Sequence, residues 1–113
     1  MSAWKDLEKR VCQALGADRK PSIGPAGYAR GSDDDGRAYF SVETKRSKRR
    51  VPEGRWIEQA RRNGKADGRP WLLVVAGHND RRPIAVLDFW ELVQLAQDAG
   101  RIPEIAIKPE KVT

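Results

Sequence analysis

The most hydrophobic run in the chain constrains the fold more than any other feature. It reads Trp71-Leu-Leu-Val-Val-Ala76 and lies between Pro70 and Gly77. A run this short and apolar at every position is typical of a strand buried on both faces, because a strand with one wet face alternates apolar and polar residues. The sequence therefore predicts a sheet with helices packed against it.

The segments on either side of this run predict the rest of the sheet. Residues 39–45 are predicted to form a strand, and residues 56–62 a short helix that ends at Asn63-Gly64. A strand, a helix and a second strand in this order make a right-handed crossover, so the strand at 39–45 and the apolar run are expected to be parallel. A further strand at 84–87 is expected to pair with the apolar run as a hairpin. We therefore predict an α/β domain with a mixed sheet flanked by helices.

Helices are also predicted near the two ends of the domain. Residues 4–15 have apolar positions at helical spacing, and Gly16 follows as a natural C-cap. Asp88 is a typical N-cap for the other helix, which ends at Gly100. The apolar face of that helix consists of Phe89, Leu92, Val93 and Ala96.

The remaining segments are rich in glycine or proline. Residues 18–31 predict a loop that leads into a short strand at 28–32. Residues 101–113 are broken by two prolines and predict an extended arm. We therefore expect one domain over residues 1–100, followed by this arm.

Length and composition indicate a single small soluble domain, since 113 residues can bury one modest core. No apolar run approaches the roughly 20 residues of a membrane span, and residues 1–15 lack the apolar centre of a signal peptide. We therefore expect a cytoplasmic protein with no membrane partner. Cys12 is the only cysteine, which excludes an intrachain disulfide and a zinc site built from several thiolates. Its apolar helical surroundings predict a small core residue.

The positive charge of the chain is concentrated in its middle. Residues 45–69 contain ten basic and three acidic residues and so carry +7, whereas the whole chain carries +6 and the remainder therefore −1. An excess of this kind predicts a polyanionic partner such as nucleic acid. The basic residues nearest the strand at 39–45 are Arg46, Lys48, Arg49, Arg50 and Arg55. They either bind phosphates without reading bases or form a solvated basic loop.

Acidic residues precede the same strand, and its end carries a carboxylate and an ammonium. The acidic residues are Asp33, Asp34 and Asp35. Because alternate residues of a strand share a face, Glu43 and Lys45 are expected to lie side by side. Carboxylate oxygens suit Mg²⁺, and a lysine two residues along the strand would orient or help deprotonate an attacking water. The alternative is a polar turn followed by the wet face of an amphipathic strand.

Helical spacing brings two further polar residues close to this strand. Glu8 lies beside the apolar stripe of the helix at 4–15, so it is either a solvated boundary carboxylate or one presented toward the strand. Gln59 lies one turn from Trp56 and faces either the same site or the solvent. Both are candidates for contacts with the acidic residues.

This order of elements and residues resembles the PD-(D/E)XK nuclease superfamily, whose restriction-endonuclease-like core is α-β-β-β-α-β. It is most similar to the small Holliday-junction resolvases of archaea and phages. Glu8 matches the helical glutamate of those resolvases, and Glu43-Thr-Lys45 matches the (D/E)XK pair. A gap of ten residues, as from Asp33 to Glu43, is typical of the family and favours Asp33 as its aspartate. Ser32 replaces the proline that usually precedes this aspartate.

The resemblance implies metal-dependent hydrolysis of phosphodiester bonds. The implied ligands of Mg²⁺ or Mn²⁺ are Asp33 (with Asp34 as second choice), Glu43 and the backbone carbonyl of Thr44. Lys45 would position the nucleophilic water, and Glu8 would complete or orient the metal shell. The side chain of Thr44 faces the core and is expected to be structural.

The function expected from this resemblance is that of a Holliday-junction resolvase in DNA recombination or repair. Symmetric incision of a four-way junction needs two active sites, so a chain with one site is expected to act as a homodimer on branched DNA. So compact a nuclease would suit a phage. The alternatives are a nicking or DNA-repair enzyme of the same fold, a non-catalytic basic nucleic-acid-binding module and a small protein-interaction domain.

Overall fold

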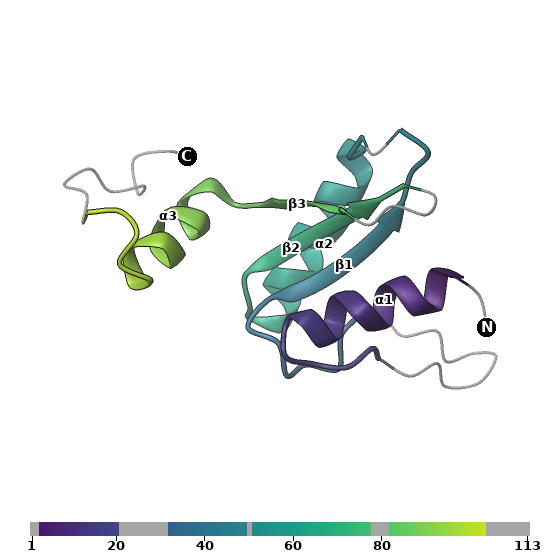
Figure 1. Cartoon of the computed structure of the whole chain (residues 1–113), viewed down its shortest axis with the longest axis horizontal. Helices are drawn as coiled ribbons and strands as arrows, with labels where there is room; N and C mark the ends of the chain where they lie inside the picture. Colours follow the sequence, from purple (N-terminus) through teal and green to yellow (C-terminus); the bar gives the residue numbers. More distant parts are fainter. Residues whose placement is uncertain (1–2, 21–31, 50, 78–81, 104–113) are drawn as a thin grey trace.

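The computed structural model describes residues 3–20, 32–49, 51–77 and 82–103. Its helices and long strands follow one another in the predicted order (Figure 1). They are α1 (Ala3–Ala14), β1 (Ser41–Arg46), α2 (Gly54–Asp67), β2 (Trp71–Ala76), β3 (Ile84–Leu87) and α3 (Phe89–Asp98).

The three strands form one mixed sheet in the order β1-β2-β3. β1 runs parallel to β2, with Glu43 opposite Leu73 and Lys45 opposite Val75. β2 runs antiparallel to β3, with Val74 opposite Ala85. The predicted parallel pair, the hairpin and the α/β class are therefore confirmed. In the part of the chain that the structure describes, β1 and β3 are the outer strands of the sheet.

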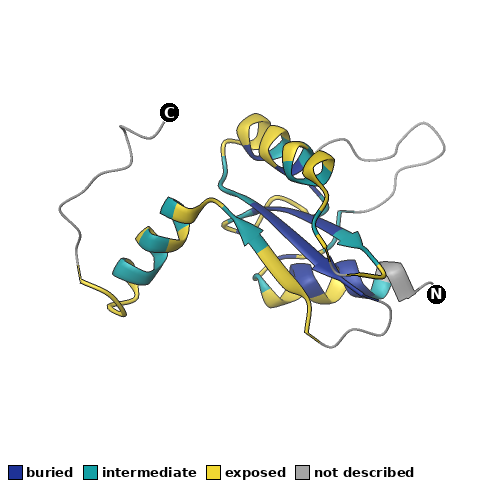
Figure 2. Ribbon diagram, turned by 90° about the horizontal axis from the view of Figure 1, so that it is seen from above, coloured by how far each residue is buried: buried dark blue, intermediate teal, exposed yellow. Residues whose placement is uncertain are grey.

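The central strand β2 is buried on both faces, as its composition predicts (Figure 2). On one face, Leu72 belongs to a core that includes Leu7 of α1. On the other face, Leu73 packs with Ala60 of α2. Alternate side chains of β2 thus supply two separate layers of core. Cys12 is fully buried, which confirms its prediction as a small core residue.

α2 is longer than predicted and continues through Asn63-Gly64 to Asp67. Gly64 is buried, and a Cβ atom added to it would lie 2.9 Å from the Cβ of Trp71. Glycine at this position therefore lets α2 approach β2 closely and does not end the helix. The helix ends instead at Gly68, whose left-handed backbone (φ of 69°) donates its N–H to the carbonyl of Gly64. The predicted end at Asn63 was wrong for this reason.

β1 begins at Ser41, two residues later than the predicted start at Tyr39. Its partner strand begins opposite, at Trp71. The residue before Trp71 is Pro70, which has no N–H to continue the ladder, although its carbonyl accepts a hydrogen bond from the N–H of Ser41 at 2.7 Å. The proline therefore sets where the parallel pairing begins.

Some predictions fall partly or wholly outside the described residues. Of the short strand expected at 28–32, only Ser32 is described, and it is not part of a strand. Residues 104–113 of the expected arm also lie outside the described ranges. No helix in the described ranges is long and apolar enough to cross a membrane.

α3 stands away from the body of the domain (Figures 1 and 2). Asp88 caps it as predicted, with its side chain accepting hydrogen bonds from the N–H groups of Trp90 and Glu91. No residue of α3 is buried, however. The predicted apolar face of this helix is therefore present but takes no part in the core of the described chain.

Candidate metal centre and nucleic-acid interface

The segment that carries the three aspartates runs along the outer edge of β1. The N–H of Asp33 donates to the carbonyl of Val42 at 2.7 Å, and the N–H of Val42 donates to Oδ1 of Asp34 at 3.1 Å. On its other side, the segment is held by the chain that follows α1, through an antiparallel bridge between Arg19 and Asp34. The aspartates are thus fixed against the strand that bears the Glu-x-Lys pair.

Thr44 orients the carboxylate of Asp33. Oδ2 of Asp33 accepts hydrogen bonds from the backbone N–H of Thr44 at 2.7 Å and from its hydroxyl at 2.8 Å. Burial raises the pKa of Asp33, and the negative charge of Glu8 adds to the rise. The hydrogen bonds from Thr44 and the charge of Lys45 lower this pKa. The Thr44 side chain is buried as predicted, and it also holds a candidate metal ligand in place.

Asp34 has no exposed surface, and fixed donors surround its carboxylate. Nη1 of Arg69 donates to Oδ2 at 2.8 Å, and the N–H of Gly36 donates to the same oxygen at 2.9 Å. Burial raises the pKa of Asp34, but the hydrogen bonds from Arg69 and from backbone N–H groups outweigh burial and hold the pKa below its usual range. The geometry therefore favours Asp34 as a structural anchor and Asp33 as the carboxylate available to a metal.

Arg69, which no sequence pattern singled out, ties the aspartate segment to the end of α2. Its guanidinium also donates to the carbonyls of Ala38 at 3.0 Å and Phe40 at 2.8 Å, and to Asp67 at 3.1 Å. Arg69 and Asp34 are 35 residues apart in the chain, so local pattern gives no sign of their contact. This one side chain joins the end of α2 to the segment that precedes β1.

The carboxylate of Glu43 faces α2 and is nearly buried, with 5% of its side chain exposed. Nζ of Lys45 lies 3.2 Å from Oε1, so the two side chains lie together as strand alternation predicts. α2 supplies two more donors, Nε2 of Gln59 at 3.2 Å from Oε1 and Nδ2 of Asn63 at 3.2 Å from Oε2. Gln59 therefore faces the site. Asn63 lies one turn further along α2. The sequence did not predict its contact with Glu43, because the helix was expected to end at Asn63.

Glu43 and Asp33 repel each other at the edge of the sheet. Burial raises the pKa of Glu43 to about 7, and the negative charge of Asp33 contributes to the rise, whereas Lys45 opposes it. Both carboxylates are thus held in a poorly solvated place where ionisation is costly. A divalent cation would relieve this repulsion, and oxygen donors of this kind suit Mg²⁺ or Mn²⁺.

Glu8 approaches Asp33 from α1. It is buried, with 8% exposed, and its Oε2 accepts a hydrogen bond from Nε of Arg19 at 2.6 Å. Its charge raises the pKa of Asp33, so the two carboxylates are within electrostatic reach. α1 therefore presents Glu8 toward the aspartate segment, and Arg19 is an ion partner that the sequence did not indicate.

The described carboxylates do not by themselves form a complete set of metal ligands. Within the described ranges, no three Asp, Glu, His or Cys side chains form a group that could hold a metal ion. Mg²⁺ needs only one or two protein carboxylates when waters and phosphate supply the other ligands. Asp33, Glu43 and the backbone carbonyl of Thr44 therefore fit an ion held by the protein on one side and by water and substrate on the other.

The basic residues predicted to bind phosphate lie around the end of β1. Lys48 and Arg49 are exposed in the turn that follows the strand. Arg46 is half-buried, and its Nε has no hydrogen-bond partner in the part of the chain that is described. Arg55 is exposed at the start of α2 in an ion pair with a neighbouring glutamate, and Arg50 lies outside the described residues. Positive charge thus adjoins the carboxylates.

Comparison of the chain with protein-family models, with curated proteins and with solved structures finds no match. Its function is therefore inferred from its own residues and their geometry.

Proposed function

We propose that this protein is a metal-dependent DNA endonuclease of the PD-(D/E)XK type that cleaves branched DNA, as a Holliday-junction resolvase does. The meeting of Asp33, Glu43 and Lys45 at one outer edge of the sheet carries the proposal. The order α1, aspartate segment, β1, α2 and β2 shares with a restriction-endonuclease-like core a first helix, a strand that bears the Glu-x-Lys pair, a second helix and a further strand.

The roles proposed for the site residues follow from their contacts. Asp33 and Glu43 would hold the Mg²⁺ or Mn²⁺ ion. The carbonyl of Thr44 and the carboxylate of Glu8 would complete or orient the metal shell. When bound, the ion would stabilise the negative charge that grows on the phosphoryl and leaving oxygens. Lys45, whose Nζ lies 3.2 Å from Glu43, would hold and orient the attacking water.

The donors around the two carboxylates support this proposal because they fix the ligands before an ion arrives. Thr44 holds Asp33 through two hydrogen bonds, and Gln59 and Asn63 each hold one oxygen of Glu43. Hydrogen bonds to metal ligands typically orient them and tune their affinity. We therefore propose Gln59 and Asn63 as positioning residues for Glu43.

The basic residues beyond β1 would bind the DNA backbone. A single phosphate contact contributes about one unit to the slope of log affinity against log salt concentration. Lys48→Ala should therefore weaken binding to all DNA sequences alike and reduce that slope by about one unit. Fluorescence anisotropy over a range of salt concentrations measures both effects.

A second function is supported by the contacts that Glu43 already makes. Its carboxylate oxygens form an ion pair with Lys45 and accept hydrogen bonds from Gln59 and Asn63. These contacts would also suit a buried structural carboxylate. A non-catalytic nucleic-acid-binding module would use the same basic residues and need no metal. The two functions differ in whether DNA is cut.

The test incubates the protein with a labelled four-way junction and with linear duplex DNA, in Mg²⁺, in Mn²⁺ and in chelator. Lys45→Ala removes the proposed water-positioning group, and Lys65→Ala is the matched control, because Lys65 is an exposed lysine near the end of α2. The proposal predicts metal-dependent paired cuts at the junction that are lost in Lys45→Ala and retained in Lys65→Ala.

Other outcomes separate the parts of the proposal. If the wild-type protein binds DNA but cuts neither substrate with either metal, the binding module replaces the endonuclease. If it cuts linear duplex as readily as the junction, the preference for branched DNA is wrong while the endonuclease stands.

A further inference from the structure

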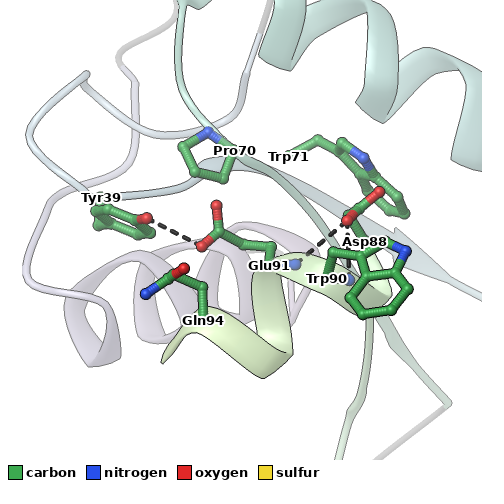
Figure 3. A pocket seen from close by; sticks show the side chains of 7 residues that line it. All are labelled: Tyr39, Pro70, Trp71, Asp88, Trp90, Glu91 and Gln94. Carbon is green, nitrogen blue, oxygen red and sulfur yellow. Dashed lines mark hydrogen bonds between the residues drawn. The ribbon is translucent and has the colours of Figure 1, made fainter. Parts of the chain in front are cut away.

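A pocket between α3 and the body of the domain takes no part in the proposed chemistry. Figure 3 shows this pocket, which has a volume of about 410 Å³. Tyr39 and Trp71 line it from the body, and Trp90 and Glu91 line it from α3. Pockets that hold small ligands measure about 300–1,000 Å³, so an organic group of moderate size fits here.

Aromatic rings and carboxylates make up the walls of this pocket. The rings belong to Tyr39, Trp71 and Trp90, and the carboxylates belong to Asp88 and Glu91. The hydroxyl of Tyr39 donates to Oε2 of Glu91 at 3.0 Å, and in the view of Figure 3 this carboxylate lies between Tyr39 and the two indole rings. The face of an aromatic ring carries partial negative charge, so rings and carboxylates together attract a cation.

The charge around the pocket is negative on the α3 side. Residues 83–100 contain three carboxylates and no Lys, Arg or His, and among the described residues no basic side chain lines the pocket. The start of a helix attracts anions through its free N–H groups. Asp88, however, already accepts hydrogen bonds from the N–H groups of Trp90 and Glu91. The pocket therefore disfavours phosphate and other anions.

One ring of the pocket already contacts a cation of its own chain. The guanidinium carbon of Arg61 lies 5.5 Å from the centroid of the Trp71 ring. Such a contact is attractive within about 6 Å, so Trp71 is placed where it can attract a cation. The charge of Arg61 is paired with Glu58 at 3.2 Å, and the nearby Arg69 is paired with Asp34 at 2.8 Å. These pairings limit the repulsion that the two arginines would exert on a second cation.

The pocket lies at the end of the sheet away from the basic residues proposed to bind DNA. The starts of β1 and β2 lie side by side, with Ser41 opposite Trp71. β3 ends at the same place, because Leu87 is opposite Leu72. Arg46 is at the other end of β1, about 17 Å along the strand from Ser41. A ligand in the pocket would therefore not compete with a phosphate bound beyond β1.

We propose that this pocket binds an organic cation, a substituted ammonium or guanidinium group. The cation would lie against the rings of Tyr39, Trp71 and Trp90, and the carboxylates of Asp88 and Glu91 would balance its charge. A small ammonium compound can carry such a group, and so can a lysine or arginine side chain of a basic peptide. Because Tyr39 and Asp88 are exposed, salt should weaken the binding. Such binding needs neither a metal ion nor DNA, so it is independent of the proposed nuclease.

The test follows the indole N–H signals of the four tryptophans by NMR in the isotope-labelled full chain. The probes are choline, a blocked glycine-arginine-glycine peptide and dimethylbutanol, the analogue of choline in which a carbon atom replaces the charged nitrogen. Glu91→Gln removes one charge at constant size, and Trp90→Leu removes one ring. Glu53→Gln is the matched control, because Glu53 is an exposed carboxylate in the segment between β1 and α2. The amide spectrum of each variant establishes that it is folded.

In the wild-type protein, choline or the peptide should shift the signals of Trp71 and Trp90 saturably and leave that of Trp56 in place. The probe that binds more tightly identifies the source of the cation. Glu91→Gln should raise the dissociation constant at least about threefold and Trp90→Leu at least about fivefold. Glu53→Gln should leave the dissociation constant unchanged.

Three results would overturn the proposal. In the first, neither cation shifts the signals of Trp71 and Trp90. In the second, dimethylbutanol binds as tightly as choline, so that the pocket takes apolar groups and charge has no part in its selectivity. In the third, a single-stranded oligonucleotide shifts the two signals and the cations do not, so that the rings stack on a nucleobase.

Discussion

At the β1 side of the sheet polar groups are buried, whereas at the β3 side apolar groups are exposed. Asp34 and Glu43 have little or no exposed surface, and several donors hold each of their carboxylates. Phe89 and Leu92 are largely exposed and belong to no core. Burying a charge costs free energy unless it is paired, and exposing apolar surface costs free energy until something covers it.

The contrast separates the proposed site of chemistry on the β1 side from an exposed apolar surface on the β3 side. The β1 side is organised by its own chain before any ligand arrives, as a site that must place an ion and a water requires. Substitutions on the two sides should therefore differ in what they disturb.

Arg69→Met should cause the largest loss of stability. It leaves the fully buried carboxylate of Asp34 without its ion partner, which typically costs about 3–5 kcal/mol of the free energy of unfolding. Urea denaturation at neutral pH measures the loss. The control is Arg37→Met, because the ion pairs of Arg37 with Asp18 and Asp35 are exposed and contribute little to stability. Equal losses in the two variants would show that Asp34 does not depend on Arg69.

The metal-free protein should lose stability as the pH rises through about 7. Folding raises the pKa of Glu43 from 4.5 to about 7, so the folded state binds this proton more tightly than the unfolded state. The resulting stabilisation is fully present below pH 4.5 and is lost as the pH rises through about 7. At 1.36 kcal/mol for each pKa unit, it amounts to about 3 kcal/mol.

Glu43→Gln cannot ionise and should lack this pH dependence. The free energy of unfolding of the variant, relative to that of the wild type, should rise by about 3 kcal/mol between pH 4.5 and pH 8. Denaturation series in chelator measure this difference. A difference that stays constant over this range would contradict the raised pKa of Glu43.

Gly64→Ala should cost about 1–3 kcal/mol, because a Cβ there would lie 2.9 Å from the Cβ of Trp71 and push α2 away from β2. Gly54→Ala is the control, since a Cβ at Gly54 meets nothing within 4 Å. Thermal unfolding compares the two variants. A neutral Gly64→Ala would mean that α2 does not pack so closely on the sheet.

Phe89→Ser should have the smallest effect on folding. Phe89 is exposed, so at a concentration where the chain is monomeric its loss should change the free energy of unfolding by about 0.5 kcal/mol or less. Leu73→Ala, in the core between α2 and the sheet, should cost about 2–5 kcal/mol under the same conditions. If the two variants lose similar stability in denaturation experiments, α3 is packed within its own chain and the contrast between the two sides fails.

Local pattern was enough to predict the framework of the fold. The uniform apolar run from Trp71 to Ala76 predicted a strand buried on both faces, because it is short, apolar at every position and bounded by Pro70 and Gly77. Strand alternation alone placed Glu43 and Lys45 side by side. Both features depend only on the period of a strand.

Features that depend on contacts between distant segments could not be predicted. The clamp of Arg69 on Asp34 joins residues 35 positions apart. Gly64 looks like a helix stop in the sequence, and only its position against Trp71 explains why α2 continues and brings Asn63 to Glu43. Arg69 and Asn63 hold carboxylates of the candidate site in place. The sequence pattern therefore predicted the carboxylates but not the residues that orient them.

The most direct test of the metal centre is a calorimetric titration of the metal-free protein with Mn²⁺. The wild-type chain should bind one ion, and Asp33→Asn and Glu43→Gln should each weaken binding by at least about tenfold. Glu58→Gln, which changes an exposed carboxylate on α2, should leave the affinity unchanged. If the wild-type chain takes up no Mn²⁺, or if all three variants bind it equally well, the carboxylates at β1 are not a metal centre and the proposed endonuclease is wrong.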